Sequence, residues 1–346
     1  MILLLLFLFS GVASAYPENI RHGYPSCTGC HVSPVGGGTL TPYGRGSSEA
    51  FISTWSVEHE GDFGYGALAL PAGLALGGDL RGVAIVTQDN TNHLTSTYIP
   101  MQADVEAAVT LLPGLLVDGS AGLYGPERTA EYRRLYLKID PLPGLSFRAG
   151  RFLPAYGINL PDHTTWVRRD LGFGEGRESN NVEAAWIGRR GEALATYRYG
   201  DDTTLRARAP GYQVRSQASG PLFRGALYLG STTQVGASYQ RVDHMESYGG
   251  FLQTGITTHG YLLTELDRRF DGQILDLALV KAGWEIAQGL MMTFQQEIDV
   301  QPDNLQTSIG LQWWPRPHWE LLGEARRSYQ DGTGTTTGVL MLHHYL

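Results

Sequence analysis

From about Leu74 to the C-terminus, apolar and polar residues alternate with a period of two, which predicts β-strands with one apolar and one polar face. The clearest apolar sets are Leu290, Met292, Phe294, Ile298 and Val300; Leu135, Leu137 and Ile139; Leu145, Phe147 and Ala149; and Leu305, Ile309, Leu311 and Trp313. The opposite set includes Arg134, Lys138, Arg148, Gln295, Glu297 and Asp299. A soluble sandwich and a membrane barrel both produce this alternation, so alternation alone does not distinguish these two folds.

The connections between the predicted strands alternate in length, and this favours the barrel. Short connections fall at 112–114, 140–144, 189–191, 230–231, 259–260, 287–289 and 315–317. Longer, more polar connections fall at 88–96, 160–178, 200–211 and 243–250. Outer-membrane barrels have tight periplasmic turns and long outer loops. We therefore predict an all-β fold, a transmembrane antiparallel barrel of about 16 strands, with 14 possible, over residues 74–346.

Composition agrees with a barrel in the bacterial outer membrane. The 45 glycines, and 18 tyrosines against 11 phenylalanines, suit short strands and tight turns. The sequence ends in a predicted strand with Tyr345 next to last, and four aromatic residues near strand ends predict interfacial girdles: Trp313, Trp314, Trp319 and Tyr329. The net charge of -8 and the lack of a Lys/Arg cluster exclude a nucleic-acid surface. Membrane lipid is the expected partner.

Residues 1–15 are typical of a cleaved secretory signal peptide. An apolar run from Ile2 to Phe9 precedes the small-residue site Ala13-Ser14-Ala15, so the mature chain is expected to begin at Tyr16. The run is too short for a spanning helix, which needs about 20 apolar residues.

Residues 16–73 lack the strand pattern and hold the sequence "GYPSCTGCHVSPVGGGTLTPYGRG". Its glycines and prolines suggest a flexible lead, and "SSEAFISTW" predicts one short helix capped by Ser47 or Ser48. A segment this small needs a cofactor, a disulfide or a partner to fold. We predict that it forms a plug for the barrel, held together by such a group.

Cys27 and Cys30, the only two cysteines, precede His31 in a CxxCH motif. This motif indicates one covalent c-type haem, with two thioether bonds to the cysteines and His31 as the proximal iron ligand. A redox CxxC pair lacks a βαβ context, a disulfide closing so small a loop stabilises little, and a zinc site lacks two further ligands.

The distal iron ligand is less determined than the proximal one. His22 is the nearest candidate in sequence. Alternatives by residue type alone are His59, His93, Met101, His163 and His244. Ligation by a second histidine is preferred, and an open sixth position is the alternative.

One CxxCH ahead of a predicted barrel resembles the fused monohaem cytochrome-porin family. The resemblance covers the whole chain in architecture, but only the CxxCH is specific as a motif. It implies an outer-membrane protein that passes electrons between an extracellular donor and the periplasm. The family's haem-attaching residues carry over to Cys27, Cys30 and His31; its electron donor does not carry over.

Three functions remain open at this stage, and an electron carrier is favoured over an enzyme. In the first, the haem sits in the lumen or at the barrel mouth and relays electrons, since a lumen of about 16 strands is wide enough for a plug. In the second, the barrel is a porin whose haem segment is structural or docks a periplasmic cytochrome. In the third, a peroxidase-like haem enzyme uses Arg168, Arg169 and His163 of the long loop.

Overall fold

The computed structural model describes residues 16–174, 176–200, 219–300, 304–330 and 332–346. The predicted signal peptide, residues 1–15, and nearly all of the predicted connection 200–211 lie outside the described residues. Among the described residues, no helix is long and apolar enough to cross a membrane.

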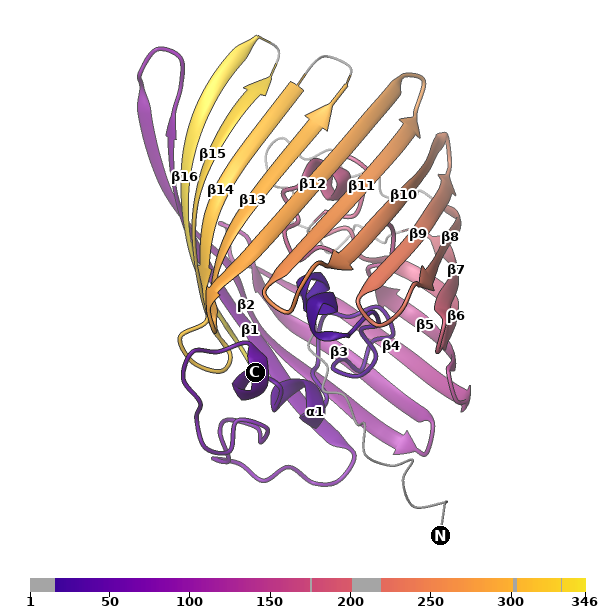
Figure 1. Ribbon diagram of the computed structural model, residues 1–346. Coiled ribbons are helices and arrows are strands. Elements are labelled where there is room, and N and C mark those ends of the chain that lie inside the picture. Colours follow the sequence, from indigo (N-terminus) through magenta and orange to yellow (C-terminus); the bar gives the residue numbers. More distant parts are fainter. Residues whose placement is uncertain (1–15, 175, 201–218, 301–303, 331) are drawn as a thin grey trace.

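In the described part of the chain, sixteen antiparallel strands form one closed barrel (Figure 1). Each strand pairs with its neighbours in sequence, and β1 pairs with β16 to close the ring. The strands are β1 (Leu74–Gln88), β2 (Leu94–Leu112), β3 (Leu115–Tyr124), β4 (Thr129–Leu142), β5 (Leu145–Phe152), β6 (Ser179–Gly188), β7 (Gly191–Tyr199), β8 (Ser219–Tyr228), β9 (Thr233–Val242), β10 (Met245–Gly255), β11 (Gly260–Phe270), β12 (Ile274–Ala287), β13 (Leu290–Asp299), β14 (Asn304–Trp313), β15 (Trp319–Gln330) and β16 (Thr333–Tyr345). The predicted fold and strand number are confirmed.

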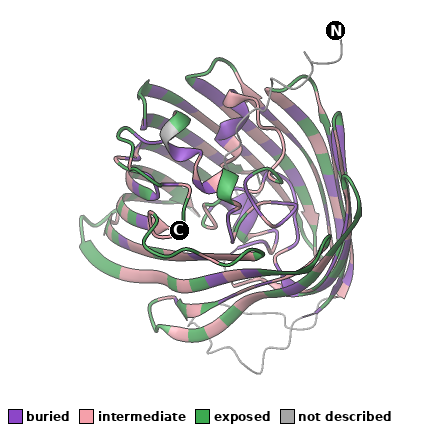
Figure 2. Cartoon of the chain, turned by 90° about the horizontal axis from the view of Figure 1, so that it is seen from below, coloured by how far each residue is buried: buried purple, intermediate pink, exposed green. Residues whose placement is uncertain are grey.

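Apolar side chains point outward and polar side chains point into the barrel. On β14, Ile309 is 59% exposed, whereas the adjacent Ser308 is 3% exposed. Exposed and buried residues alternate in the same way around the ring (Figure 2). This is the inverse of a soluble sandwich, whose apolar faces meet in a core. An outward apolar face is stable only against lipid, so the burial pattern resolves the ambiguity that alternation left.

The length asymmetry of the connections is weaker than the sequence predicts. The predicted loop 243–250 is wrong, because β9 ends at Val242 and β10 begins at Met245. Asp243 takes a positive φ of 53°, which allows a tight turn between them. Residues 125–128 and 271–273 are further short connections at that same end of the barrel. The connection 153–178, at that same end, is much longer and returns into the lumen.

The predicted aromatic girdle holds only in part. Trp319 and Tyr329 are exposed on the outer wall. Trp314 instead is buried in the interior, with its ring 5.7 Å from that of Tyr16 in an edge-on contact. It falls in the connection after β14, where the alternation that directs side chains outward has ended.

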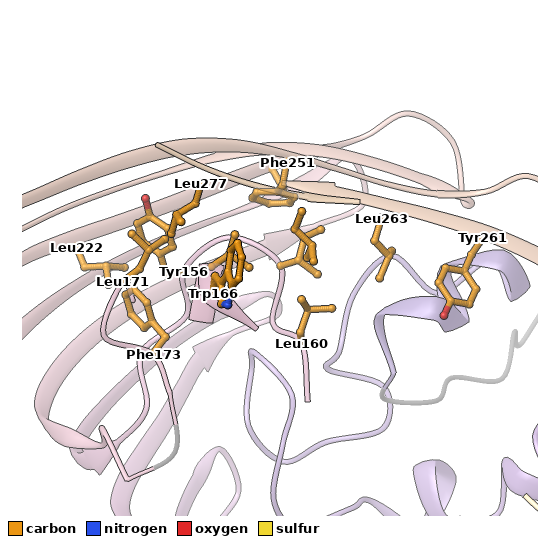
Figure 3. Close-up of a cluster of buried hydrophobic side chains, with 14 of the residues drawn as sticks. Tyr156, Leu160, Trp166, Leu171, Phe173, Leu222, Phe251, Tyr261, Leu263 and Leu277 are labelled. Carbon is orange, nitrogen blue, oxygen red and sulfur yellow. The ribbon is translucent and has the colours of Figure 1, made fainter. Parts of the chain in front are cut away.

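The connection 153–178 carries α3 (Trp166–Arg169) and packs against the inner wall of the barrel (Figure 3). It contributes seven buried apolar residues: Tyr156, Ile158, Leu160, Trp166, Val167, Leu171 and Phe173. They meet inward-facing apolar residues of the wall, which break the polar lumen pattern locally: Leu222, Phe251, Leu263, Leu277, Leu279 and Met291. This cluster, called the loop cluster below, fixes the connection across the lumen.

Candidate functional site

Residues 16–73, called the N-terminal segment, occupy one mouth of the barrel and reach into the ring of strands, at the end that carries the connections 288–289 and 314–318 (Figure 1). The helix η1 (Pro17–His22) packs on β10 and β11, and Arg21 lies 3.4 Å from Glu285 of β12. Further along the segment, the Thr54 amide donates to the Trp314 carbonyl at 2.8 Å, and the Tyr65 hydroxyl donates to the Pro317 carbonyl at 2.7 Å. Hydrogen bonds to several strands and turns thus hold the segment to the wall.

The CxxCH motif forms a single tight turn followed by a hairpin. The amides of Cys30 and His31 both donate to the Cys27 carbonyl, at 3.2 and 3.1 Å. His31 then pairs with Leu40 in an isolated antiparallel bridge. This arrangement brings both cysteines and His31 to one end of the hairpin 31–40.

A second turn, residues 41–44, packs against the backbone of Cys30. Thr41 caps the helix α1 (Pro42–Arg45) by accepting a hydrogen bond from the Gly44 amide at 3.0 Å. A Cβ at Gly44 would lie 2.4 Å from the Cys30 carbonyl oxygen, so only glycine fits. The predicted short helix is present as α2 (Ser48–Phe51), but its N-cap Ser47 donates to the Gly44 carbonyl at 2.7 Å instead of capping.

The glycine run after the motif is a packed turn and not the flexible lead that the sequence suggests. Gly36, Gly37 and Gly38 have φ values of 84°, 71° and 70°, which favour glycine at all three positions. A Cβ at Gly36 would lie 3.2 Å from Cys27 Sγ, and one at Gly38 would lie 2.2 Å from Cζ of Arg134. The run therefore folds back beneath the CxxCH turn and against β4.

The His31 imidazole is neutral, and one of its two nitrogens, Nε2, has no hydrogen-bond partner among the described residues. Its Nδ1 lies 3.2 Å from the Gly38 carbonyl, an acceptor, so Nδ1 carries the proton and donates. Nε2 is buried without a hydrogen-bond partner among the described residues. Burial lowers the pKa of His31 to about 4, with the nearby Arg134 charge acting in the same direction. An Nδ1–H donor to a backbone carbonyl and a free Nε2 are the features of a metal-binding histidine.

A cavity of about 390 Å³ lies between the N-terminal segment and the inward connection 153–178. Cys27 and His31 line it from the segment, Arg134 and Arg148 from the wall, and Arg168 and Phe173 from the connection. Cys30 is 1% exposed and does not line the cavity, so its thiol must turn toward it for a second thioether. Carboxylates line the cavity as well, and three of them are paired within the wall: Asp104 with Tyr124, Glu106 with Arg134, and Glu192 with Arg224. The apolar members of the lining and the cationic Arg168 would suit an apolar macrocycle with carboxylate side groups.

The cysteine chemistry weighs against the other uses of a CxxC pair. Cys27 and Cys30 are free thiols in the structure. Burial raises the pKa of each thiol to about 12, whereas redox-active cysteines have lowered values. Among the described residues, no three His, Cys, Asp or Glu side chains form a group that suits a metal ion. A zinc site and a dithiol redox site are both disfavoured by this environment.

The structure does not bring His22 to the cavity. Its ring lies 4.6 Å from that of Phe51, and its Nε2 accepts a hydrogen bond from Arg21 at 2.9 Å. His59, His93 and His244 are exposed away from the cavity. Two of the predicted alternatives, Met101 and His163, do line it.

Of the three residues considered for a haem enzyme, Arg168 and His163 line the cavity and Arg169 does not. Arg169 is largely exposed and pairs with Asp170 at 2.7 Å. Buried cations of the lumen wall are matched by carboxylates, as in the pair of the cavity-lining Arg148 with Glu183 at 2.7 Å. The predicted inward charges on β4, β5 and β13 are confirmed.

Several contacts that build the site escaped sequence reasoning, although Lys138 and Arg148 were predicted to face inward. Lys138 donates to the Val32 carbonyl at 2.9 Å, and Arg148 donates to Ser33 at 3.2 Å. Asn159 of the inward connection donates to the Val35 carbonyl at 2.7 Å. The one available signal was the density of Gly, Thr and Pro in 33–46, which we interpreted as a linker. Composition does not distinguish a linker from a set of tight turns.

No protein family profile and no curated protein sequence matches this chain. Its fold is similar to that of solved outer-membrane channels. An anion-selective porin from Comamonas acidovorans superposes with a TM-score of 0.60 at 11% identity, over 79% of this chain and 99% of that chain. OmpT of Vibrio cholerae gives 0.58 at 10% identity, over 81% and 100%, and the channel DcaP of Acinetobacter baumannii gives 0.56 at 11%, over 81% and 99%.

At these identities the likeness establishes the 16-strand porin fold, and function must be argued from the site. The similar structures are porins. The resemblance to fused monohaem cytochrome-porins, which rests on the CxxCH, stays a prediction.

Proposed function

We propose that this chain is an outer-membrane barrel of the porin type that carries one covalent c-type haem in its lumen and passes electrons through it. The outward apolar face and the likeness to porins support the membrane location. The CxxCH supports the haem. One observation carries the combination: Cys27 and His31 line a lumenal cavity, and His31 Nε2 is buried there with no partner among the described residues.

The residues at the cavity have distinct roles in this proposal. Cys27 and Cys30 would form the thioether bonds, and His31 would hold the iron through Nε2 while its Nδ1 donates to the Gly38 carbonyl. When bound, the haem supplies reversible one-electron exchange. Arg168 of the inward connection lines the cavity and would pair with the haem carboxylates, whereas Arg134 and Arg148 are already paired with carboxylates of the wall. Met101 and His163 are the distal candidates that the cavity offers.

Position in the lumen matters because tunnelling is short-ranged and the apolar band of such a barrel is about 25 Å tall. The cavity is bounded by the N-terminal segment at one end and by the connection from the opposite end of the barrel. The two meet directly where Asn159 donates to Val35. The distance from a haem placed here to a redox partner at either mouth would be shorter than the full height of the apolar band.

Proteoliposomes test this function. With a membrane-impermeant reductant outside and a trapped oxidant inside, the haem-loaded protein should oxidise the external reductant. The double variant Cys27→Ala/Cys30→Ala keeps the barrel but cannot attach haem, and it is the matched control. Electron flow equal to that of the control would overturn the electron-transfer proposal.

A solute channel is the second candidate, and a specific observation favours it. The solved structures similar to this chain include an anion-selective porin and a channel, and the lumen wall here is lined by charges of both signs. In this case the N-terminal segment is structural or docks a periplasmic cytochrome. Planar-bilayer recordings distinguish the two, because a channel gives stepwise ionic conductance in both the haem-loaded protein and the double cysteine variant.

A further inference from the structure

Gly38 connects the imidazole of His31 to Arg134 of the barrel wall. The Gly38 carbonyl accepts the hydrogen bond from His31 Nδ1 at 3.2 Å. On its other side, Gly38 has no side chain between itself and Arg134, because a Cβ there would overlap the guanidinium at 2.2 Å from Cζ. The guanidinium therefore packs directly on the residue that orients the imidazole.

Arg134 is itself fixed by carboxylates from two neighbouring strands. Its Nε donates to Asp118 of β3, and its Nη2 lies 3.3 Å from Glu106 of β2. The Asp118 and Glu106 side chains are 1% and 9% exposed. The charge is thus held in place by three adjacent strands and is shielded from solvent, where electrostatic effects are largest.

We propose that Arg134 is a positioning residue that holds the Gly38 carbonyl against His31 and raises the reduction potential of the haem that His31 binds. This rests on the proposed function. Ferric haem carries one more positive charge than ferrous haem, so a nearby cation disfavours the ferric state. Reduction adds one electron to the iron and breaks no bond. Hydrogen bonds to a metal ligand, and charges close to it, change the reduction potential of the metal.

The test is a redox titration of purified, haem-loaded variants. Arg134→Gln should shift the ferric/ferrous equilibrium about tenfold toward ferric haem, a lower midpoint potential by about 59 mV for one electron. Arg134→Lys, which keeps the charge, should recover part of the shift. Arg198→Gln is the control, because Arg198 is a buried lumenal arginine on β7 that does not line the cavity.

A second variant changes the same charge cluster in the opposite direction. Asp118→Asn removes a negative charge and leaves Arg134 in place, so it should raise the midpoint potential. Unchanged potentials in both Arg134→Gln and Asp118→Asn would overturn the proposal. If Arg134→Gln does not insert or load haem, Asp118→Asn decides alone. A wild-type protein without covalent haem would overturn the proposed function itself, which is a distinct result.

Discussion

At the scale of single residues, the site depends on groups whose hydrogen-bonding or conformational needs leave little choice of side chain. His31 has one nitrogen committed to Gly38 and one without a partner among the described residues. Gly36, Gly37 and Gly38 hold left-handed backbone, and two of them also touch neighbours that a Cβ would displace. The motif and its glycine run therefore act as one unit.

Gly38→Ala tests this unit against a matched control, Gly37→Ala. Both residues have a positive φ, 70° and 71°, so alanine costs each about 1 kcal/mol of backbone strain. Gly37 has open space around its Cβ position, whereas Gly38 faces Arg134. We expect Gly38→Ala to reduce covalent haem content at least severalfold and Gly37→Ala to change it little, by haem staining of purified barrels. Equal effects would contradict the packing argument.

His318 predicts a pH dependence for the docking of the N-terminal segment. It is buried, and its Nε2 donates to the Glu60 carbonyl at 3.2 Å. Burial lowers the pKa of His318 to about 4, with Arg45 adding to the effect, against an ordinary value of 6.5. The undocked state therefore binds a proton first, and docking weakens as the pH falls from about 6.5 to 4, by about 2 to 3 kcal/mol at pH 4.5.

Limited proteolysis measures this docking. Cleavage within residues 56–70 should be slow at pH 7 and faster near pH 4.5, with digestion by an acid-tolerant protease. His318→Gln keeps a donor but does not titrate, so its cleavage should vary less with pH. A wild-type profile that is flat over this range would contradict the assignment of a buried neutral His318.

At the scale of elements, strands were predictable from sequence and the lumenal segments were not. The period-two alternation of β4, β5, β13 and β14 identifies both faces, because each strand of a barrel meets lipid on one side and the lumen on the other. The connection 153–178 and the N-terminal segment have no such period. Their positions depend on contacts with distant strands, such as Asn159 with Val35 and Thr54 with Trp314.

Leu171→Ala tests whether the loop cluster holds the connection in the lumen. Leu171 is 0% exposed, and removing a buried leucine side chain costs about 2 to 5 kcal/mol. We expect the variant to raise single-channel conductance in planar bilayers, because the connection then leaves the lumen part of the time. Leu311→Ala, on the outward face, is the control and should leave conductance unchanged. Equal conductance in both variants would contradict a structural role for the cluster.

At the scale of the whole molecule, the burial pattern defines a barrel with a lipid-facing outside and a filled, charged inside. Ile309 lies near the middle of β14 and is 59% exposed. In a soluble protein an exposed position tolerates arginine. In a barrel, arginine at the bilayer midplane costs about 2 to 4 kcal/mol.

Ile309→Arg should therefore lower folding into lipid vesicles, measured as the heat-modifiable band on gels. Ile309→Leu keeps the apolar contact with lipid and should fold as the wild type does. Folding of the arginine variant at the wild-type level would contradict the assignment of this face to lipid.

The most direct measurement is the intact mass of the protein purified from the outer membrane of a host that matures c-type cytochromes. The mass should equal the chain from Tyr16 plus one haem, and the Cys27→Ala/Cys30→Ala variant should lack the haem mass while still folding as a barrel. A wild-type mass equal to the polypeptide alone would contradict the haem assignment and leave the channel as the function that the fold supports.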